Sequence, residues 1–214
     1  AIKSFVVEKG TPGMEVVRLE EKLGIKASDT AAIAFVDCRV PKENLLGNPD
    51  IDVKKGFGGV MQTFDNTRPV VASMAIGVAQ AALDRTREIL SFSSVKANYR
   101  KPVNQSSYIE ACLYKMEADL EASRLLTLKA AWMADNAQPN SVEASMAKAK
   151  AGRTANEITL KCVELCGSLG YEEDELLEKW ARDSKILDIF EGTQQIQLLI
   201  IARRLLNKTS AELK

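Results

Sequence analysis

The spacing of apolar residues changes character after the first quarter of the chain. Residues 1–49 carry short apolar runs, at positions 4–7 and 32–36, separated by turn-like segments that contain Gly and Pro. This pattern is typical of strands joined by turns. The second run continues towards Val40 with alternating apolar and polar residues, which predicts a strand with one face in water. We therefore expect a partial β-domain over residues 1–49.

From about residue 58 onwards, apolar residues recur at helical spacing. The pattern predicts a shorter stretch at 173–180 and four long helices over residues 59–92, 106–136, 141–166 and 193–206. Pro102, Pro139 and the glycines of residues 167–170 lie in the breaks between these helices. The sequence thus predicts a mainly α fold, with an antiparallel helical bundle over residues 50–214 that follows the partial β-domain.

Composition narrows the class of protein. The chain has 214 residues, of which 46% are hydrophobic, so it can bury a sizeable core. It has 29 basic and 29 acidic residues, and therefore no net charge that would attract nucleic acid or an acidic bilayer. No apolar run approaches the roughly 20 residues of a membrane span. The N-terminus also lacks a signal-like segment, and we expect a cytoplasmic protein.

The chain begins at Ala1, without an initiator methionine, and enters directly on a predicted strand. An open strand edge has unpaired N–H and C=O groups that need cover. We expect an N-terminal part to be missing, either by truncation or because the protein is one piece of a longer polypeptide.

Cysteine and histidine usage argues against a metal site. The chain has four cysteines and no histidine, and Cys162 and Cys166 are spaced to share one face of a helix. Two thiolates need further soft ligands nearby to hold a metal, and the sequence offers none. We interpret both cysteines as small buried apolar residues.

One carboxylate, Glu191, lies between apolar residues and Gly192, immediately before the last predicted helix. Burial among apolar neighbours disfavours an ionised acid and would suit a general base. Gly192 lets the backbone approach a ligand, and Thr193 can cap the helix, whose free N–H groups attract an anion. From these residues alone, an ordinary acidic residue at a helix start is the more frequent explanation, and both interpretations stay open.

Several stretches resemble the acyl-CoA dehydrogenase family, in the family's order and near its spacing. Residues 64–69 (FDNTRP) resemble the substrate motif, and residues 190–197 (FEGTQQIQ) resemble the motif that carries the base. The resemblance covers essentially the whole chain. The stretches that resemble the second half of the family's β-domain are residues 5–13 (FVVEKGTPG), 22–24 (KLG), 28–30 (SDT) and 40–47 (VPKENLLG).

The resemblance implies an FAD enzyme that converts an acyl-CoA thioester to its trans-2-enoyl-CoA, with electron-transfer flavoprotein as the electron acceptor. Glu191 takes the position of the base that abstracts the α-proton, while hydride passes to the flavin. The thioester carbonyl gains negative charge during this step and needs hydrogen-bond donors. By resemblance, these are the backbone N–H of Glu191 and a ribityl hydroxyl of the flavin, and Gly192 lies where the thioester approaches the main chain.

The resemblance also implies further ligand contacts. Asp65 and Arg68 occupy positions that contact the coenzyme A arm, and Arg68 is also a candidate for ordering the Glu191 region. The alternative for this pair is a helix-surface ion pair worth only tenths of a kcal/mol. In full, the resemblance assigns acyl-CoA to Phe64, Asp65, Thr67, Arg68 and Gly192, and FAD to Thr193 and Gln195.

Three positions depart from the family pattern. Ser93 stands where family members carry an arginine that reaches the FAD of a neighbouring subunit, and Glu164 and Ser168 replace the glutamine and a glycine of a second such site. A serine cannot grip a pyrophosphate as an arginine does, and a glutamate repels it. We expect a heteromeric acyl-CoA dehydrogenase in which a related, non-identical subunit supplies the missing groups, with one FAD per heterodimer. This fragment alone is not expected to hold FAD.

Two other functions remain open from the sequence. One is a non-catalytic structural partner in such a complex, and the other is an acyl-CoA oxidase that passes electrons to oxygen. Oligomerisation is expected in each case, because the last helix carries more apolar residues than one intrachain face needs. These residues are Leu198, Leu199, Ile200, Ile201, Leu205 and Leu206.

Overall fold

The computed structural model describes residues 3–50, 58–209 and 212. It divides into two compact units, residues 1–63 and 64–214. In the first unit, β1 (Ser4–Phe5) pairs with β4 (Leu45–Leu46), and β2 (Met14–Leu19) pairs with β3 (Ala31–Phe35), both antiparallel. A short 3-10 helix, η1 (Lys42–Asn44), precedes β4. The expected β structure is therefore present, while the domain boundary at residues 49 and 50 stays a prediction.

Two strands of this unit differ from expectation. The strand predicted to run towards Val40 ends at Phe35, and that prediction was wrong because Asp37 adopts a left-handed conformation (φ 48) that breaks the extended backbone. β2 was not predicted. Its sequence does not alternate cleanly, and the pairing with β3 shifts register between Val16 and Arg18. Such a bulge interrupts the two-residue period on which strand prediction relies.

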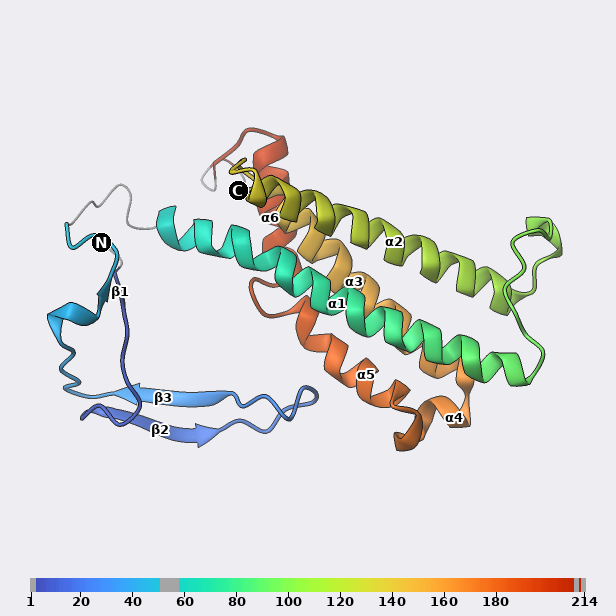
Figure 1. Ribbon diagram of the computed structural model, residues 1–214, viewed down its shortest axis with the longest axis horizontal. Helices are drawn as coiled ribbons and strands as arrows, with labels where there is room; N and C mark the ends of the chain where they lie inside the picture. Colours follow the sequence, from blue (N-terminus) through green and yellow to red (C-terminus); the bar gives the residue numbers. More distant parts are fainter. Residues whose placement is uncertain (1–2, 51–57, 210–211, 213–214) are drawn as a thin grey trace. The chain divides into compact units, whose positions relative to one another are not determined.

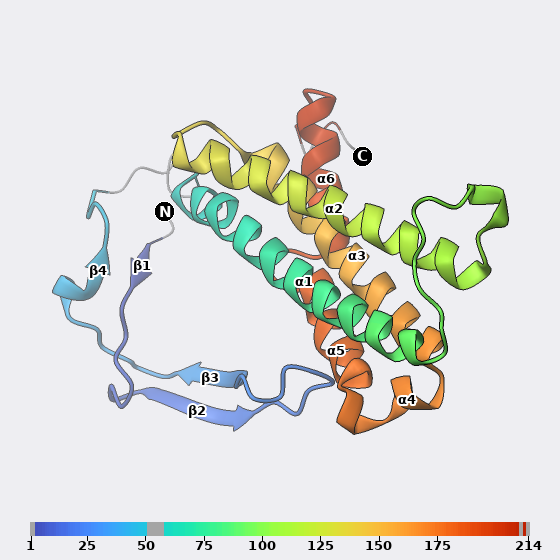
Figure 2. The ribbon, with the colours of Figure 1, turned by 45° about the vertical axis from the view of Figure 1, so that its right-hand side comes forward.

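The second unit is a helical bundle, as predicted. Its long helices are α1 (Gly58–Phe92), most of which belongs to this unit, α2 (Tyr108–Asp135) and α3 (Ser141–Cys166). Figures 1 and 2 show these three side by side, with neighbours in sequence running in opposite directions. The shorter elements are η2 (Val103–Gln105), α4 (Ser168–Tyr171), η3 (Glu173–Glu175), α5 (Leu177–Ser184), η4 (Lys185–Asp188) and α6 (Gln194–Leu205).

Local sequence signals explain where the helices begin. Ser107 accepts a hydrogen bond from the Glu110 backbone, and the Glu110 side chain accepts one from the Ser107 backbone, which forms a capping box at the start of α2. The Ser107 backbone bond and the nearby Lys101 ammonium lower the pKa of Glu110 to about 2. The stretch predicted over 173–180 is split into η3 and α5, because Leu176 is left-handed (φ 61).

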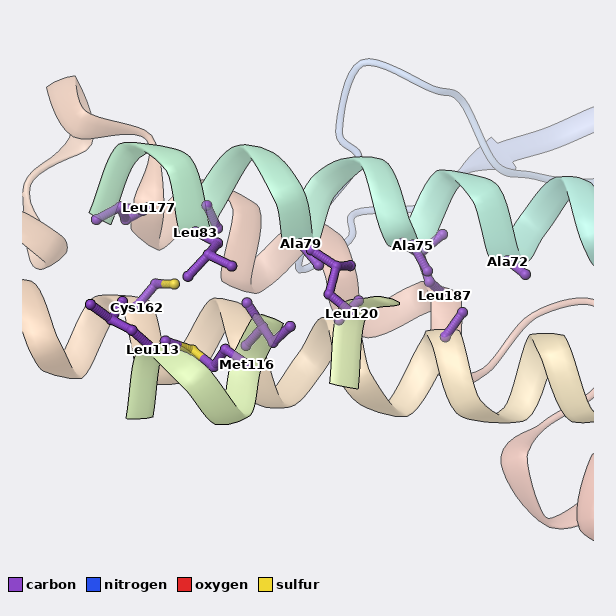
Figure 3. Close-up of a cluster of buried hydrophobic side chains, with 14 of the residues drawn as sticks. Ala72, Ala75, Ala79, Leu83, Leu113, Met116, Leu120, Cys162, Leu177 and Leu187 are labelled. Atoms are coloured by element: carbon purple, nitrogen blue, oxygen red, sulfur yellow. The ribbon is translucent and has the colours of Figure 1, made fainter. Parts of the chain in front are cut away.

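The core of the bundle depends on small residues along α1. Figure 3 shows Ala72, Ala75, Ala79 and Leu83 in a row that faces side chains from α2, α3, α5 and η4. Alanine lets neighbouring helices approach closely, and the larger residues fill the remaining space. The facing side chains include Leu113, Met116, Leu120, Cys162, Leu177 and Leu187.

Cys162 is fully buried in this core, as predicted, and Cys166 is half-buried. Burial raises the pKa of Cys162 to about 12. The residues that the structure describes contain no group of three or more His, Cys, Asp or Glu side chains placed to hold a metal ion. Within the same residues, no helix is both long enough and apolar enough to cross a bilayer.

Candidate active site

Glu191 lies in a tight turn between η4 and α6. Its backbone is left-handed (φ 56), a conformation that costs a residue with a side chain roughly 1–2 kcal/mol. Gly192 follows with φ +95, and a Cβ atom at that position would lie 2.4 Å from Nε2 of Gln197. Thr193 then caps α6, since its hydroxyl accepts a hydrogen bond from the backbone of Ile196. The turn therefore needs glycine at 192 and places the half-buried Glu191 side chain directly before the helix.

The Glu191 carboxylate accepts a hydrogen bond from a hydroxyl that is distant in the sequence. Thr67, on α1, donates a hydrogen bond of 2.8 Å from Oγ1 to Oε2 of Glu191. A hydrogen bond to the charged form of a carboxylate favours that form and fixes its orientation. Thr67 therefore holds the carboxylate in one place.

Arg68, the next residue on α1, is only 3% exposed. Its Nη1 lies 2.6 Å from Oδ1 of Asp65 and 3.5 Å from Oγ of Ser145, while its Nε has no hydrogen-bond partner among the described residues. Burial lowers the pKa of Arg68, and the charges of Asp65 and Glu191 oppose this effect. The ion pair is thus buried next to the carboxylate and does not lie on an open helix surface.

A proline shapes the same part of α1. Pro69 has no N–H, so the carbonyl of Asp65 loses the donor that a regular helix would provide. Nδ2 of Asn140 approaches that carbonyl at 3.4 Å and also donates to the carbonyl of Ala130 at 3.0 Å. Asn140, at the start of α3, therefore connects the ends of α2 and α3 to the helix turn that carries Thr67 and Arg68.

Beneath the Glu191 turn, two buried donors converge on main-chain carbonyls. Nζ of Lys148 donates to the Gly192 carbonyl at 2.7 Å, and Nε2 of Gln197 donates to the carbonyls of Glu191 (3.1 Å) and Gly192 (3.2 Å). Both side chains are fully buried. Burial lowers the pKa of Lys148 to about 8; the charges of Asp188 and Glu191 oppose this shift, and Arg68 adds to it.

Sequence reasoning missed Lys148, although a signal was present. Lys148 follows Ala144 by four residues and precedes Ala151 by three, so it shares their helix face, and both alanines are buried. A lysine on such a face must point into the protein. Gln197 lay within the quoted motif, but nothing in its local pattern distinguished it from its neighbours.

The helix α3 contributes three contacts to this region from one face. Ser145 lies beside Arg68, Lys148 bonds to Gly192, and Gly152 lets the backbone of η4 approach. A Cβ atom at Gly152 would lie 2.7 Å from the carbonyl oxygen of Leu187. The structure therefore brings together Asp65, Thr67, Arg68, Glu191 and Gly192 of the predicted site. The side chain of Phe64 lies at the edge, 36% exposed, with the Arg68 guanidinium 6.0 Å from its ring centre.

Comparison with known proteins decides the family. Residues 54–206 match the family described as acyl-CoA dehydrogenase, C-terminal domain. The chain belongs to the acyl-CoA dehydrogenase family. It is 40% identical over 205 residues to the mitochondrial short-chain specific acyl-CoA dehydrogenase of Rattus norvegicus, covering 96% of this chain and 48% of that protein. A probable acyl-CoA dehydrogenase of Bacillus subtilis is 36% identical, with 96% and 52% covered.

Solved structures agree with this assignment. The butyryl-CoA dehydrogenase of Megasphaera elsdenii superposes with a TM-score of 0.82 and 36% identity, covering 95% of this chain and 51% of that one. A chain from a structure described as the electron transferring flavoprotein of Acidaminococcus fermentans gives a TM-score of 0.84 and 34% identity, with 96% and 52% covered. This acyl-CoA dehydrogenase chain thus spans about half the length of the relatives it matches.

The other predicted positions of this acyl-CoA dehydrogenase family member lie on the surface of the bundle. The Gln195 side chain is exposed in the first turn of α6. Ser93 is exposed just after α1, and Ser168 is exposed at the start of α4. Glu164 is exposed on α3, where it pairs with Lys161 at 2.5 Å.

The apolar side chains of α6 are only partly covered. Ile200 and Ile201 are half-buried, whereas the fully buried residue of this helix is the polar Gln197. The expected interface on this helix stays a prediction. The exposed apolar residues of α6 and its C-terminal end are Ile196, Leu198, Leu199, Leu205 and Leu206.

Proposed function

We propose that this chain is the C-terminal part of an FAD-dependent acyl-CoA dehydrogenase, in which Glu191 removes the α-proton of an acyl-CoA thioester to give the trans-2-enoyl-CoA. The observation that carries the proposal is the placement of the Glu191 carboxylate. It is oriented by Thr67 at 2.8 Å, in a turn whose carbonyls are held by two buried side chains. A carboxylate in a purely structural bundle needs no such arrangement.

Each residue of this site has a distinct role in the proposed reaction. Glu191 accepts the proton at a carboxylate oxygen, and the hydrogen bond from Thr67 keeps that carboxylate oriented until it does so. The backbone N–H of Glu191 is assigned to the thioester carbonyl, where negative charge develops. Gly192 is assigned to the place where the thioester approaches the main chain. The turn itself needs glycine there, because a Cβ atom would lie 2.4 Å from Nε2 of the buried Gln197.

Substrate contacts are proposed at the start of the described part of α1. Phe64, whose side chain is 36% exposed, is assigned to contacts with the acyl-CoA together with Thr67. Asp65 and Arg68 were expected at the coenzyme A arm. With Arg68 only 3% exposed, we assign the pair mainly to ordering this turn of α1 against Glu191.

FAD, when bound, supplies the acceptor for the hydride that leaves the β-carbon. The N-terminus of α6 fits such a group. Thr193 caps the helix, the side chain of Gln195 is exposed in the first turn, and helix N-termini favour polar and anionic ligand groups. Thr193 and Gln195 would therefore hold the cofactor on this chain's side.

The surface positions that depart from the family support a heteromeric enzyme. Ser93, Glu164 and Ser168 are exposed, so a neighbouring subunit can reach them, but none of them can grip a pyrophosphate. We propose that a related, non-identical subunit supplies the missing groups and that electron-transfer flavoprotein reoxidises the flavin. Co-purification with a related subunit and a flavin-to-protomer ratio near one half would support this assembly; a homo-oligomer with one flavin per chain would refute it.

The function is tested by Glu191→Gln in the complete enzyme with its partner. The variant keeps the shape of the side chain and removes the base, so flavin reduction by acyl-CoA should slow by about 100-fold to 10,000-fold, the range typical of a lost general base. Glu172→Gln, an exposed acid outside the turn, is the matched control and should leave the rate unchanged. Unchanged dehydrogenation in Glu191→Gln would favour a structural role for this chain. Peroxide formation in place of reduced electron-transfer flavoprotein would favour an oxidase.

A further inference from the structure

The turn that carries Glu191 needs support from its surroundings. Glu191 is a residue with a side chain held at φ 56, and such conformations persist where neighbouring groups over-determine them. Two side chains supply this support: the Gly192 carbonyl accepts hydrogen bonds from Lys148 at 2.7 Å and from Gln197 at 3.2 Å. Both donors are fully buried, so water does not compete with them.

Burying a lysine ammonium to support a turn costs free energy. Its ammonium loses its hydration and gains one hydrogen bond to a neutral carbonyl. An apolar side chain of the same length would fill the same space in α3, whose neighbouring buried residues are largely alanine. Stability alone therefore does not explain a charged residue at this position.

The charges that face Lys148 explain it better. Asp188, on η4, is buried, and Glu191 is half-buried; both favour the charged form of Lys148, while Arg68 on α1 disfavours it. The ammonium therefore interacts with the turn in two ways: it donates to the Gly192 carbonyl at 2.7 Å, and it lies close enough to Asp188 and Glu191 for their charges to stabilise it.

We propose that Lys148 is a positioning residue for proton abstraction: its ammonium donates to the Gly192 carbonyl at 2.7 Å and thereby fixes the backbone of the turn that carries Glu191. Gln197 is its uncharged counterpart, since it holds the same turn without adding charge. This inference rests on the proposed role of Glu191 as the base.

The test uses the complete enzyme with three variants. Lys148→Met keeps the length of the side chain and removes both donor and charge. Gln197→Met removes only a neutral donor. Lys150→Met is the control, because Lys150 lies two residues further along α3 and pairs with Asp119, which keeps a second partner in Lys115.

We expect Lys148→Met to lower kcat about 10-fold to 100-fold, as expected for a lost charge-assisted contact, while KM for acyl-CoA changes less than about 3-fold. Gln197→Met should also lower kcat more than it changes KM, because it removes the other donor to the same turn. Lys150→Met should behave as wild type.

The outcomes separate this inference from the proposed function. If Glu191→Gln is inactive but Lys148→Met matches Lys150→Met in both kcat and KM, Lys148 has no positioning role. If Glu191→Gln retains activity, the proposed base is wrong, whatever Lys148 does. If Lys148→Met does not fold, the Gln197→Met variant decides. Wild-type kcat in that variant would overturn the claim that buried donors to the Glu191 and Gly192 carbonyls position the base.

Discussion

The hydroxyl of Thr67 donates a hydrogen bond of 2.8 Å to the carboxylate of Glu191, although 124 positions separate the two residues in the chain. The bond connects α1 to the turn before α6. It therefore depends on the assembly of the whole bundle and not on local structure.

Removing this donor should weaken catalysis without unfolding the protein. A hydrogen bond to a charged group contributes about 1.5–3 kcal/mol, so we expect Thr67→Val to lower kcat at neutral pH by about 10-fold or more. Thr67→Ser keeps the hydroxyl and should retain most activity. Ser73→Ala, on the same helix, removes a hydroxyl that donates to the Val70 carbonyl, and should have no effect on steady-state rates.

Gly192 should tolerate no side chain. In Gly192→Ala, the new methyl group meets Gln197 Nε2 at 2.4 Å in a backbone with φ +95. We expect a loss of about 1–3 kcal/mol in the free energy of unfolding, together with a loss of activity. Gly77→Ala is the control, because a Cβ atom there meets nothing within 4 Å inside α1. Alanine favours a helix, so chemical denaturation should show Gly77→Ala to be as stable as wild type or more stable; equal losses in the two variants would contradict this account.

The ion pair of Asp65 and Arg68 should matter far more than a surface pair of the same spacing. In Asp65→Asn, the buried guanidinium loses its counter-charge, and breaking a buried pair costs about 3–5 kcal/mol. Glu121→Gln breaks the pair with Arg124 at the same three-residue spacing on the open face of α2, where we expect less than about 1 kcal/mol. Urea unfolding of both variants measures the difference, and similar values would show that the Asp65 pair is solvated.

Stability should depend on pH through Lys148. Its pKa falls from an ordinary 10.5 to about 8 in the folded protein. Between pH 8 and 10.5 the unfolded chain therefore binds more protons at this side chain than the folded protein does, and stability rises with pH. At about 1.4 kcal/mol for each pKa unit, wild type should gain up to about 3 kcal/mol relative to Lys148→Met across this range. Comparing the two proteins in urea at each pH cancels the titration of the cysteines, and a constant difference would contradict the burial of a charged Lys148.

Local patterns predicted the bundle well, because its boundaries have local causes. The α3 helix begins and ends where expected, after Asn140 and before Gly167, and Thr193 caps α6 as predicted. The errors also have local causes. β2 carries a bulge, Asp37 ends β3 early, and Leu176 adopts a left-handed backbone that few leucines adopt.

The candidate site was harder to predict, because its contacts join distant parts of the sequence. The motifs identified Glu191, Arg68 and Thr67, but not that the hydroxyl of Thr67 meets the carboxylate. They also did not show that Arg68 is buried, which favours one of its two expected roles, ordering the Glu191 region, over contacting coenzyme A. Lys148 lies in an alternating Lys-Ala stretch that also contains Lys150. Only the position of each lysine around the helix distinguishes the buried Lys148 from the half-buried Lys150.

Ser145, Lys148 and Gly152 follow one another along α3 at intervals of three and four residues, and each meets a different part of the Glu191 region. Adding or deleting one residue between them would rotate the rest of the helix by about 100° and move at least one of these groups to another side. The length of this segment should therefore drift far less over evolution than its composition. An insertion scan would find α3 intolerant at positions where many individual substitutions are harmless.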